Sequence, residues 1–173
     1  TSVGALNGIM MCMDELEKAE EVWASMDYTR VLDVEPKVID SLKNLNFRSL
    51  NFSEMAAEVK KAVKGGGLNI DPLKRLIEEM VDEEKVRNSP RECFATAFSV
   101  SERKEINFNL KLAPEGTMKD MLLASSYFPG FKNDKLFGKT YMDGGSVNNV
   151  PVNVLTDRGY KDIIVIRIFG IGV

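Results

Sequence analysis

The sequence predicts an α/β domain in which helices dominate the first half of the chain and strands the second. Two observations predict this class. Apolar residues recur at steps of three and four over residues 3–26 and again after residue 71, as in amphipathic helices. From Cys93 onward the pattern changes to alternation and short β-prone runs. A length of 173 residues fits one domain, over 1–173, with a substantial core.

Four helices are expected in the first half, over residues 3–13, 14–26, 53–64 and 71–87. The first follows Ser2 and contains small residues that allow close packing on a neighbour. The third is stopped by the glycines at 65–67, and Asp71-Pro72 supplies the N-cap and first residue of the fourth. Residues 27–51 are mixed and Asn-rich, with one short amphipathic stretch over 36–45.

The second half predicts a hairpin and then alternating helices and strands. Strands over 93–100 and 106–112 are joined by the short polar connection 101–104. A helix over 117–126, capped by Thr117, ends before Pro129. Next come a short strand over 139–142, a helix over 151–158 and a buried strand over 162–168.

Composition excludes several classes of function. The net charge is −3 without a basic block, so nucleic acid is not an expected partner. No apolar run approaches the length that spans a bilayer. With no histidine and no C-x-x-C pair, we expect neither a metal site nor a cofactor. Cys12 and Cys93 are expected to be reduced, buried thiols of a cytoplasmic protein.

The first candidate for chemistry is Ser2. Thr1-Ser2-Val3-Gly4 reads as the back half of a G-x-S-x-G nucleophile elbow, with Gly4 as the glycine that a crowded turn needs. The same four residues also suit an ordinary helix N-cap. Since the chain has no histidine, a catalytic Ser2 needs another type of base or a base outside this sequence.

The second candidate is Asp143. It follows a short predicted strand and precedes Gly144-Gly145, where the chain can turn tightly. Read alone, it suits a turn in which the carboxylate bonds its own backbone. A turn of this kind does not explain why a half elbow, a missing histidine and a strand-end aspartate occur together.

This combination resembles the patatin-like phospholipase family along most of the chain. Three motifs carry the resemblance, in the family's order: the elbow at residues 1–8, the segment Ala124-Ser125-Ser126-Tyr127-Phe128-Pro129-Gly130-Phe131, and Asp143-Gly144-Gly145 with Asn149-Val150-Pro151. The closing strand pattern at 162–168 is also similar. The resemblance implies a three-layer α/β/α domain with a mostly parallel sheet flanked by helices.

The resemblance further implies a carboxylic ester hydrolase acting on a lipid or acyl-ester substrate through a Ser–Asp dyad. Ser2 would be the nucleophile and Asp143 the base, with an acyl-enzyme intermediate. The backbone N–H of Val3 would donate to the oxyanion, and Gly4, Gly144 and Gly145 would be motif glycines. Peripheral contact with a membrane surface is also expected.

The chain departs from the family pattern at one point. In the family, the first strand and the glycine-rich oxyanion loop precede the elbow, whereas this sequence begins at the elbow. We therefore expect a domain truncated at its N-terminus, with little activity of its own and a tendency to self-associate. The glycines at 65–67 stand on the wrong side of the elbow to replace that loop.

Two other functions remain open from the sequence. One is a Ser–Asp–His α/β-hydrolase whose histidine lies beyond residue 173. The other is a lipid-binding domain without catalysis. Near the second motif, residues 125–128 invite a lipid-contact interpretation, with Phe131 and Phe137 nearby. We expect 125–128 instead to pack the helix end against the sheet.

Overall fold

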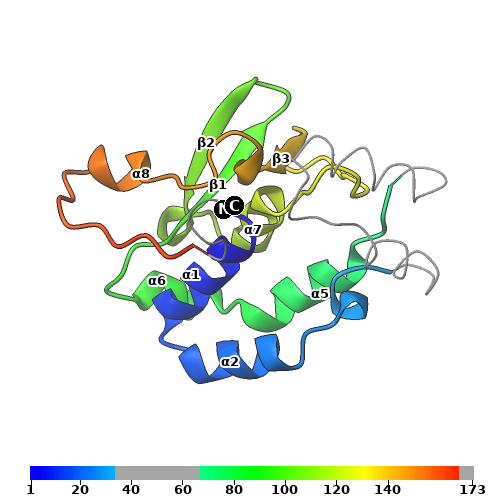
Figure 1. Ribbon diagram of the computed structural model, residues 1–173, viewed down its shortest axis with the longest axis horizontal. Helices are drawn as coiled ribbons and strands as arrows, with labels where there is room; N and C mark the ends of the chain where they lie inside the picture. The colour runs from blue at the N-terminus through cyan, green and yellow to red at the C-terminus, as the bar shows by residue number, and fades with distance from the viewer. Residues whose placement is uncertain (34–66, 168–173) are drawn as a thin grey trace.

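The computed structural model describes residues 1–33 and 67–167, which form helices around a small sheet (Figure 1). The α/β class predicted from the sequence is confirmed. The elements in chain order are α1 (Val3–Met13), α2 (Leu16–Ala24), the 3-10 helix η1 (Tyr28–Arg30), α5 (Asp71–Met80), α6 (Glu83–Asn88), β1 (Phe94–Ser99), β2 (Lys104–Asn109), η2 (Leu110–Leu112), α7 (Met118–Ser125), β3 (Tyr141–Asp143), η3 (Gly144–Ser146) and α8 (Asn153–Thr156).

The sheet has the strand order β2-β1-β3 and is antiparallel at both pairings. The predicted β1–β2 hairpin is confirmed, since a four-residue connection can join only antiparallel neighbours. The second strand ends at Asn109, however, and residues 110–112, which we expected to continue it, form η2. The mostly parallel sheet that we expected is not found among the described residues. Strand β3 pairs with β1 so that Asp143 lies opposite Ala97. This register places the end of β3 beside the middle of the central strand.

Helix α1 lies at the centre of the molecule, between the sheet and α2 (Figure 1). It contacts β1, α7, α2 and α6. Its side chains Leu6, Ile9 and Met10 are almost fully buried, as the helical spacing predicted. The N-terminal end of α1 is therefore held at a fixed position relative to β1 and α7.

Two predicted helices differ from those observed. The helix expected over 71–87 is broken at Val81, because Asp82 caps a new helix by accepting the N–H groups of Glu84 and Lys85. The N-cap of α5 is Ile70, so Asp71 lies in the first turn. Helix α8 is shorter than the predicted 151–158.

The buried strand expected over 162–168 is not formed in residues 162–167, which have no regular structure. The side chains of Ile164 and Ile166 are 91% and 84% exposed. An apolar run becomes a buried strand only when a neighbouring strand pairs with it, and no described strand does so. The predictions at 36–45 and 53–64 and the glycines at 65 and 66 lie outside the described residues, as does residue 168.

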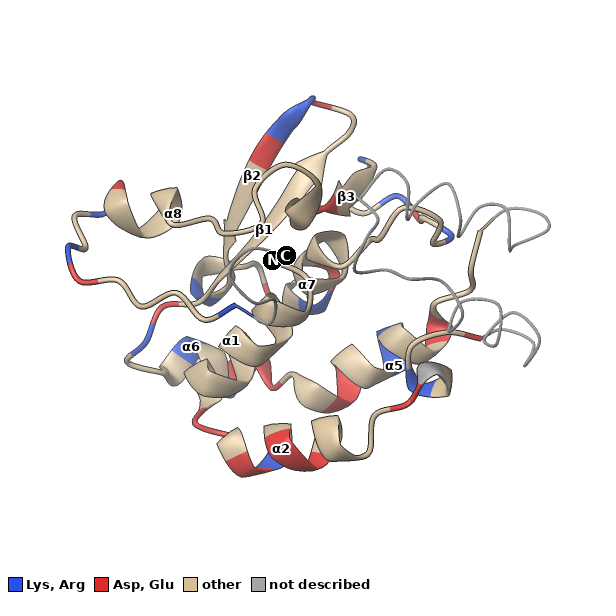
Figure 2. Ribbon diagram, in the orientation of Figure 1, with Lys and Arg blue, Asp and Glu red and all other residues tan. Residues whose placement is uncertain are grey.

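No helix within 1–33 and 67–167 is long and apolar enough to cross a membrane. Acidic residues gather along α2 (Figure 2).

Candidate active site

Ser2 occupies a strained turn at the start of α1. Its φ of 51° and ψ of −130° lie in a region of backbone conformation where residues other than glycine are uncommon. Its carbonyl accepts the N–H of Ala5 at 2.8 Å, which begins the helix. Its side chain makes no capping hydrogen bond. The ordinary N-cap interpretation therefore fails, and the hydroxyl is left available to act outside the helix.

The turn at Ser2 is anchored to α7 through Ser125. The N–H of Ser2 points at both Ser125 oxygens, 3.1 Å from the carbonyl and 3.0 Å from Oγ. The Ser125 hydroxyl donates in turn to the carbonyl of Thr96 in β1 at 2.7 Å. Ser125 is fully buried, so water does not compete for these bonds. One side chain thus joins the elbow, α7 and the central strand.

Asp143 is buried at the end of β3, with only 4% of its surface exposed. Its N–H donates to the carbonyl of Tyr127 at 2.8 Å, and its Oδ1 accepts the N–H of Gly145 at 2.7 Å. The turn that the sequence suggested is therefore present. The Ser2 side chain lies close enough to this carboxyl group to act on its pKa. The structure thus places together the two residues singled out from the sequence.

Burial raises the pKa of Asp143, because an ionised carboxylate loses its hydration there. The hydroxyl of Ser2 and the N–H of Gly145 act in the opposite direction, since both stabilise the ionised form. The net direction is upward. A carboxylate with a raised pKa holds a proton more readily, as a general base must.

The motif glycines have different roles. A Cβ on Gly144 would lie 2.2 Å from the carbonyl oxygen of Thr96 and 3.0 Å from Cγ2 of Thr1, so only glycine fits. A Cβ on Gly145 would lie 3.1 Å from Oδ1 of Asp143. Gly4 differs from our expectation of crowding, because nothing lies within 4 Å of its Cβ position.

The comparison with known families is decisive. A family model described as patatin-like phospholipase matches residues 1–156, which include both Ser2 and Asp143. This chain belongs to the patatin-like phospholipase family. The resemblance noted in the sequence is confirmed. Members of this family are hydrolases that act on lipids. Searches of curated proteins and of solved structures return no match.

Val3 follows the nucleophile candidate of this patatin-like domain. It is the first residue of α1, so its N–H has no carbonyl partner within the helix. Its side chain is 41% exposed, and the space beside Gly4 is open. A substrate oxygen can therefore approach the first N–H groups of α1, where the helix dipole favours negative charge. The described residues hold no group of three metal-ligating side chains.

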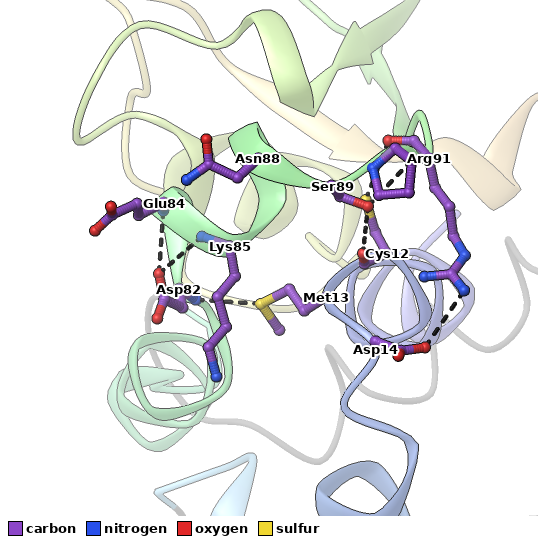
Figure 3. Close-up of a pocket in the computed structure, with 10 residues that line it drawn as sticks. Cys12, Met13, Asp14, Asp82, Glu84, Lys85, Asn88, Ser89 and Arg91 are labelled. Carbon is purple, nitrogen blue, oxygen red and sulfur yellow. Dashed lines mark hydrogen bonds and ion pairs between the residues drawn. The ribbon is translucent and has the colours of Figure 1, made fainter.

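A hollow on this patatin-like chain lies at the opposite end of α1 (Figure 3). It is lined by residues from the end of α1, from α6 and from the segments on either side of α6, among them Cys12, Asp82 and Arg91. An 11-residue helix is about 16 Å long, so this hollow is well separated from Ser2. Some of its polar groups have structural roles, since Asp82 caps α6 and Asp14 pairs with Arg91 at 3.3 Å.

Proposed function

We propose that residues 1–173 belong to the catalytic domain of a serine acyl hydrolase in which Ser2 is the nucleophile and Asp143 the general base. The observation that carries this proposal is the setting of the pair. A serine in a strained turn, with its hydroxyl not used for capping, faces a buried carboxylate whose pKa is raised. Strained backbone and perturbed carboxyl groups are concentrated at active sites.

In the acylation step, the Asp143 carboxylate takes the proton of the Ser2 hydroxyl while Oγ attacks the carbonyl carbon of an acyl ester. The carbonyl π electrons move to its oxygen, giving a tetrahedral oxyanion. The C–O bond to the alcohol then breaks, and the departing alkoxide takes the proton from Asp143. The product is an acyl-enzyme on Ser2.

In the deacylation step, the same carboxylate takes a proton from water as the water attacks the acyl carbon. The second tetrahedral intermediate collapses, Oγ of Ser2 leaves with the proton from Asp143, and the fatty acid is released. The N–H of Val3 is proposed as one donor to the oxyanion in both steps. One such donor contributes on the order of 10²–10³ in turnover.

The proposed substrate is a lipid with an ester-linked acyl chain. Membership of the family supports this class. The test is the hydrolysis of a short-chain p-nitrophenyl ester by the whole protein, beside Ser2→Ala and Asp143→Asn variants whose folding has been checked by circular dichroism. We expect both variants to lose activity together.

Two other results would change the assignment. If Asp143→Asn stays near the wild-type rate while Ser2→Ala is inactive, another base serves Ser2, as in a Ser–Asp–His hydrolase. If the wild-type protein hydrolyses neither short-chain nor long-chain esters, the domain binds lipid without catalysis.

A further inference from the structure

A strained, exposed aromatic side chain lies outside the site already described. Phe137 has a φ of 52° and its side chain is 45% exposed. A bulky residue in the left-handed region is a true outlier, with a conformational cost of roughly a few RT. Neither the dyad nor the buried core accounts for that cost.

The strain has a defined structural setting. Leu136 and Lys139 exchange two backbone hydrogen bonds of 2.9 Å, so residues 136–139 form a tight turn, here called the Phe137 turn. Its central residues, Phe137 and Gly138, both have positive φ, as in type I′ turns. Such turns favour Asn-Gly, which would occupy this position without strain. Here the turn presents an aromatic ring to solvent.

Cationic side chains surround the Phe137 turn. Residues 100–104 at the end of the β1–β2 hairpin, here called the basic tip, lie against it. The N–H of Val100 donates to the carbonyl of Thr140 at 2.9 Å, and Lys139 pairs with Glu102 at 2.9 Å. The same carboxylate lies 3.7 Å from Lys104. Figure 2 shows basic residues at the tip of β2 and in the loop that leads into β3.

The local charge is opposite to that of the chain. The turn and the tip carry Arg103, Lys104 and Lys139 against the single acid Glu102, and Lys135 comes directly before the turn. Asp134, the acid next to Lys135, is paired with Lys74 of α5 at 2.7 Å. These four cations and the one acid, Glu102, give a local net charge of +3, whereas the whole chain is −3. Val100, which is 44% exposed, adds apolar surface to the tip.

We propose that the Phe137 turn and the basic tip form the surface by which this protein docks onto an anionic lipid bilayer. An exposed aromatic ring suits the apolar boundary of the headgroup region, and the surrounding cations suit the negative surface potential of anionic lipids. The turn continues directly into β3, which ends at Asp143. A bilayer contact at the turn therefore holds the dyad a short strand away from the lipid.

The choice of a lipid surface as the partner rests on the proposed function. The test measures binding apart from hydrolysis, with the whole protein in a Ser2→Ala background. Co-sedimentation is followed with vesicles of phosphatidylcholine containing phosphatidylglycerol, and with vesicles of phosphatidylcholine alone. The variants added are Phe137→Asn, Lys135→Gln and, as a matched control, Leu112→Asn. Leu112 is 77% exposed but lies in η2, which contacts α6.

We expect binding to the anionic vesicles and much weaker binding to phosphatidylcholine alone. Phe137→Asn should weaken anionic binding about tenfold, because the buried part of a ring is lost. It should leave the midpoint of thermal unfolding unchanged or higher, since asparagine tolerates this φ. Lys135→Gln should weaken binding about fivefold, and Leu112→Asn should have no effect.

The inference is overturned if Phe137→Asn binds as tightly as its parent, or if Leu112→Asn weakens binding equally. Equal binding to both vesicle types also overturns it. If vesicle binding fails while the wild-type protein hydrolyses a soluble ester, this inference falls and the proposed function stands. If vesicle binding follows the expected pattern but the wild-type protein has no esterase activity, this inference stands and the proposed function falls.

Discussion

The two ends of α1 contrast sharply. At its start, Ser2 is in a strained conformation, Asp143 is buried beside it, and Gly144 has no room for a side chain. At its other end lies an open hollow whose charges are solvated, as with Asp14 and Arg91, with side chains 77% and 53% exposed. Strained backbone and buried carboxylates are concentrated at active sites, so we place the proposed chemistry at the start of α1 and not at the hollow.

The largest expected effect comes from Gly144→Ala at the strained end. The new Cβ would lie 2.2 Å from a backbone oxygen of β1, which cannot move without disturbing the sheet. We expect a loss of about 3 kcal/mol in the free energy of unfolding, together with loss of any esterase activity. Urea unfolding followed by circular dichroism measures the first quantity.

Gly4→Ala is the matched control for that substitution. The alanine methyl group meets nothing within 4 Å and lies in a helix, so the protein should gain about 0.5–1 kcal/mol. Equal stability losses from Gly4→Ala and Gly144→Ala would show that the two glycines are not distinguished by packing.

Asp143→Asn is expected to reduce kcat by about 10²–10⁴, the usual contribution of a general base. In the wild-type protein, kcat/KM should rise with pH through a pKa above the ordinary 3.8, because burial raises the pKa of this carboxyl. A pH–rate profile with soluble ester measures this. An acid limb at or below the ordinary value would contradict the assignment of Asp143 as base.

The same substitution has a predicted effect on stability. A raised folded-state pKa means that the folded protein binds a proton more tightly than the unfolded chain. Stability therefore falls as pH rises from the unfolded pKa through the folded one. Asp143→Asn should remove that fall and be as stable as the wild type, or more so, at neutral pH. Thermal unfolding at several pH values tests this.

Ser125→Ala should have a smaller effect, through position rather than chemistry. It removes the hydrogen bonds of Oγ to Ser2 and Thr96, at a cost of about 1–2 kcal/mol. We expect kcat to fall about tenfold with KM little changed.

The matched control is Ser126→Ala, which removes the hydrogen bond from Oγ to the Leu122 carbonyl but no bond to the elbow. Its stability loss should be similar and its kcat unchanged. A similar loss of kcat in both variants would show that Ser125 acts only through general stability.

The smallest effect is expected at the hollow. Arg91→Gln breaks an exposed ion pair, and such pairs contribute roughly 0–1 kcal/mol. Neither the unfolding midpoint nor kcat should change appreciably. A large loss of activity would give the hollow a part in the reaction and would remove the contrast between the two ends of α1.

Local patterns in the sequence predicted the helix after Ser2, the β1–β2 hairpin, α7 and the position of Asp143 at a strand end. They did so because helix periodicity, alternation and turn residues act over a few residues. The break between α5 and α6 also had a local signal, since Asp82 is a good N-cap residue inside the predicted helix.

What could not be predicted depends on contacts far apart in the chain. The hydrogen bonds of Ser125 to Ser2 and Thr96 span 123 and 29 residues, so no spacing rule finds them. The open space beside Gly4 and the lack of space at Gly144 likewise depend on tertiary packing, which the local sequence does not reveal. The apolar run at 162–167 has strand composition, but a strand also needs a partner.

The measurement that tests the central proposal most directly is labelling of the whole protein with a fluorophosphonate, located by peptide mass spectrometry. We expect covalent modification at Ser2, with a rate that falls about a hundredfold or more in Asp143→Asn. Label on another serine, or labelling of Ser2 at an unchanged rate in Asp143→Asn, would contradict the pairing of these two residues.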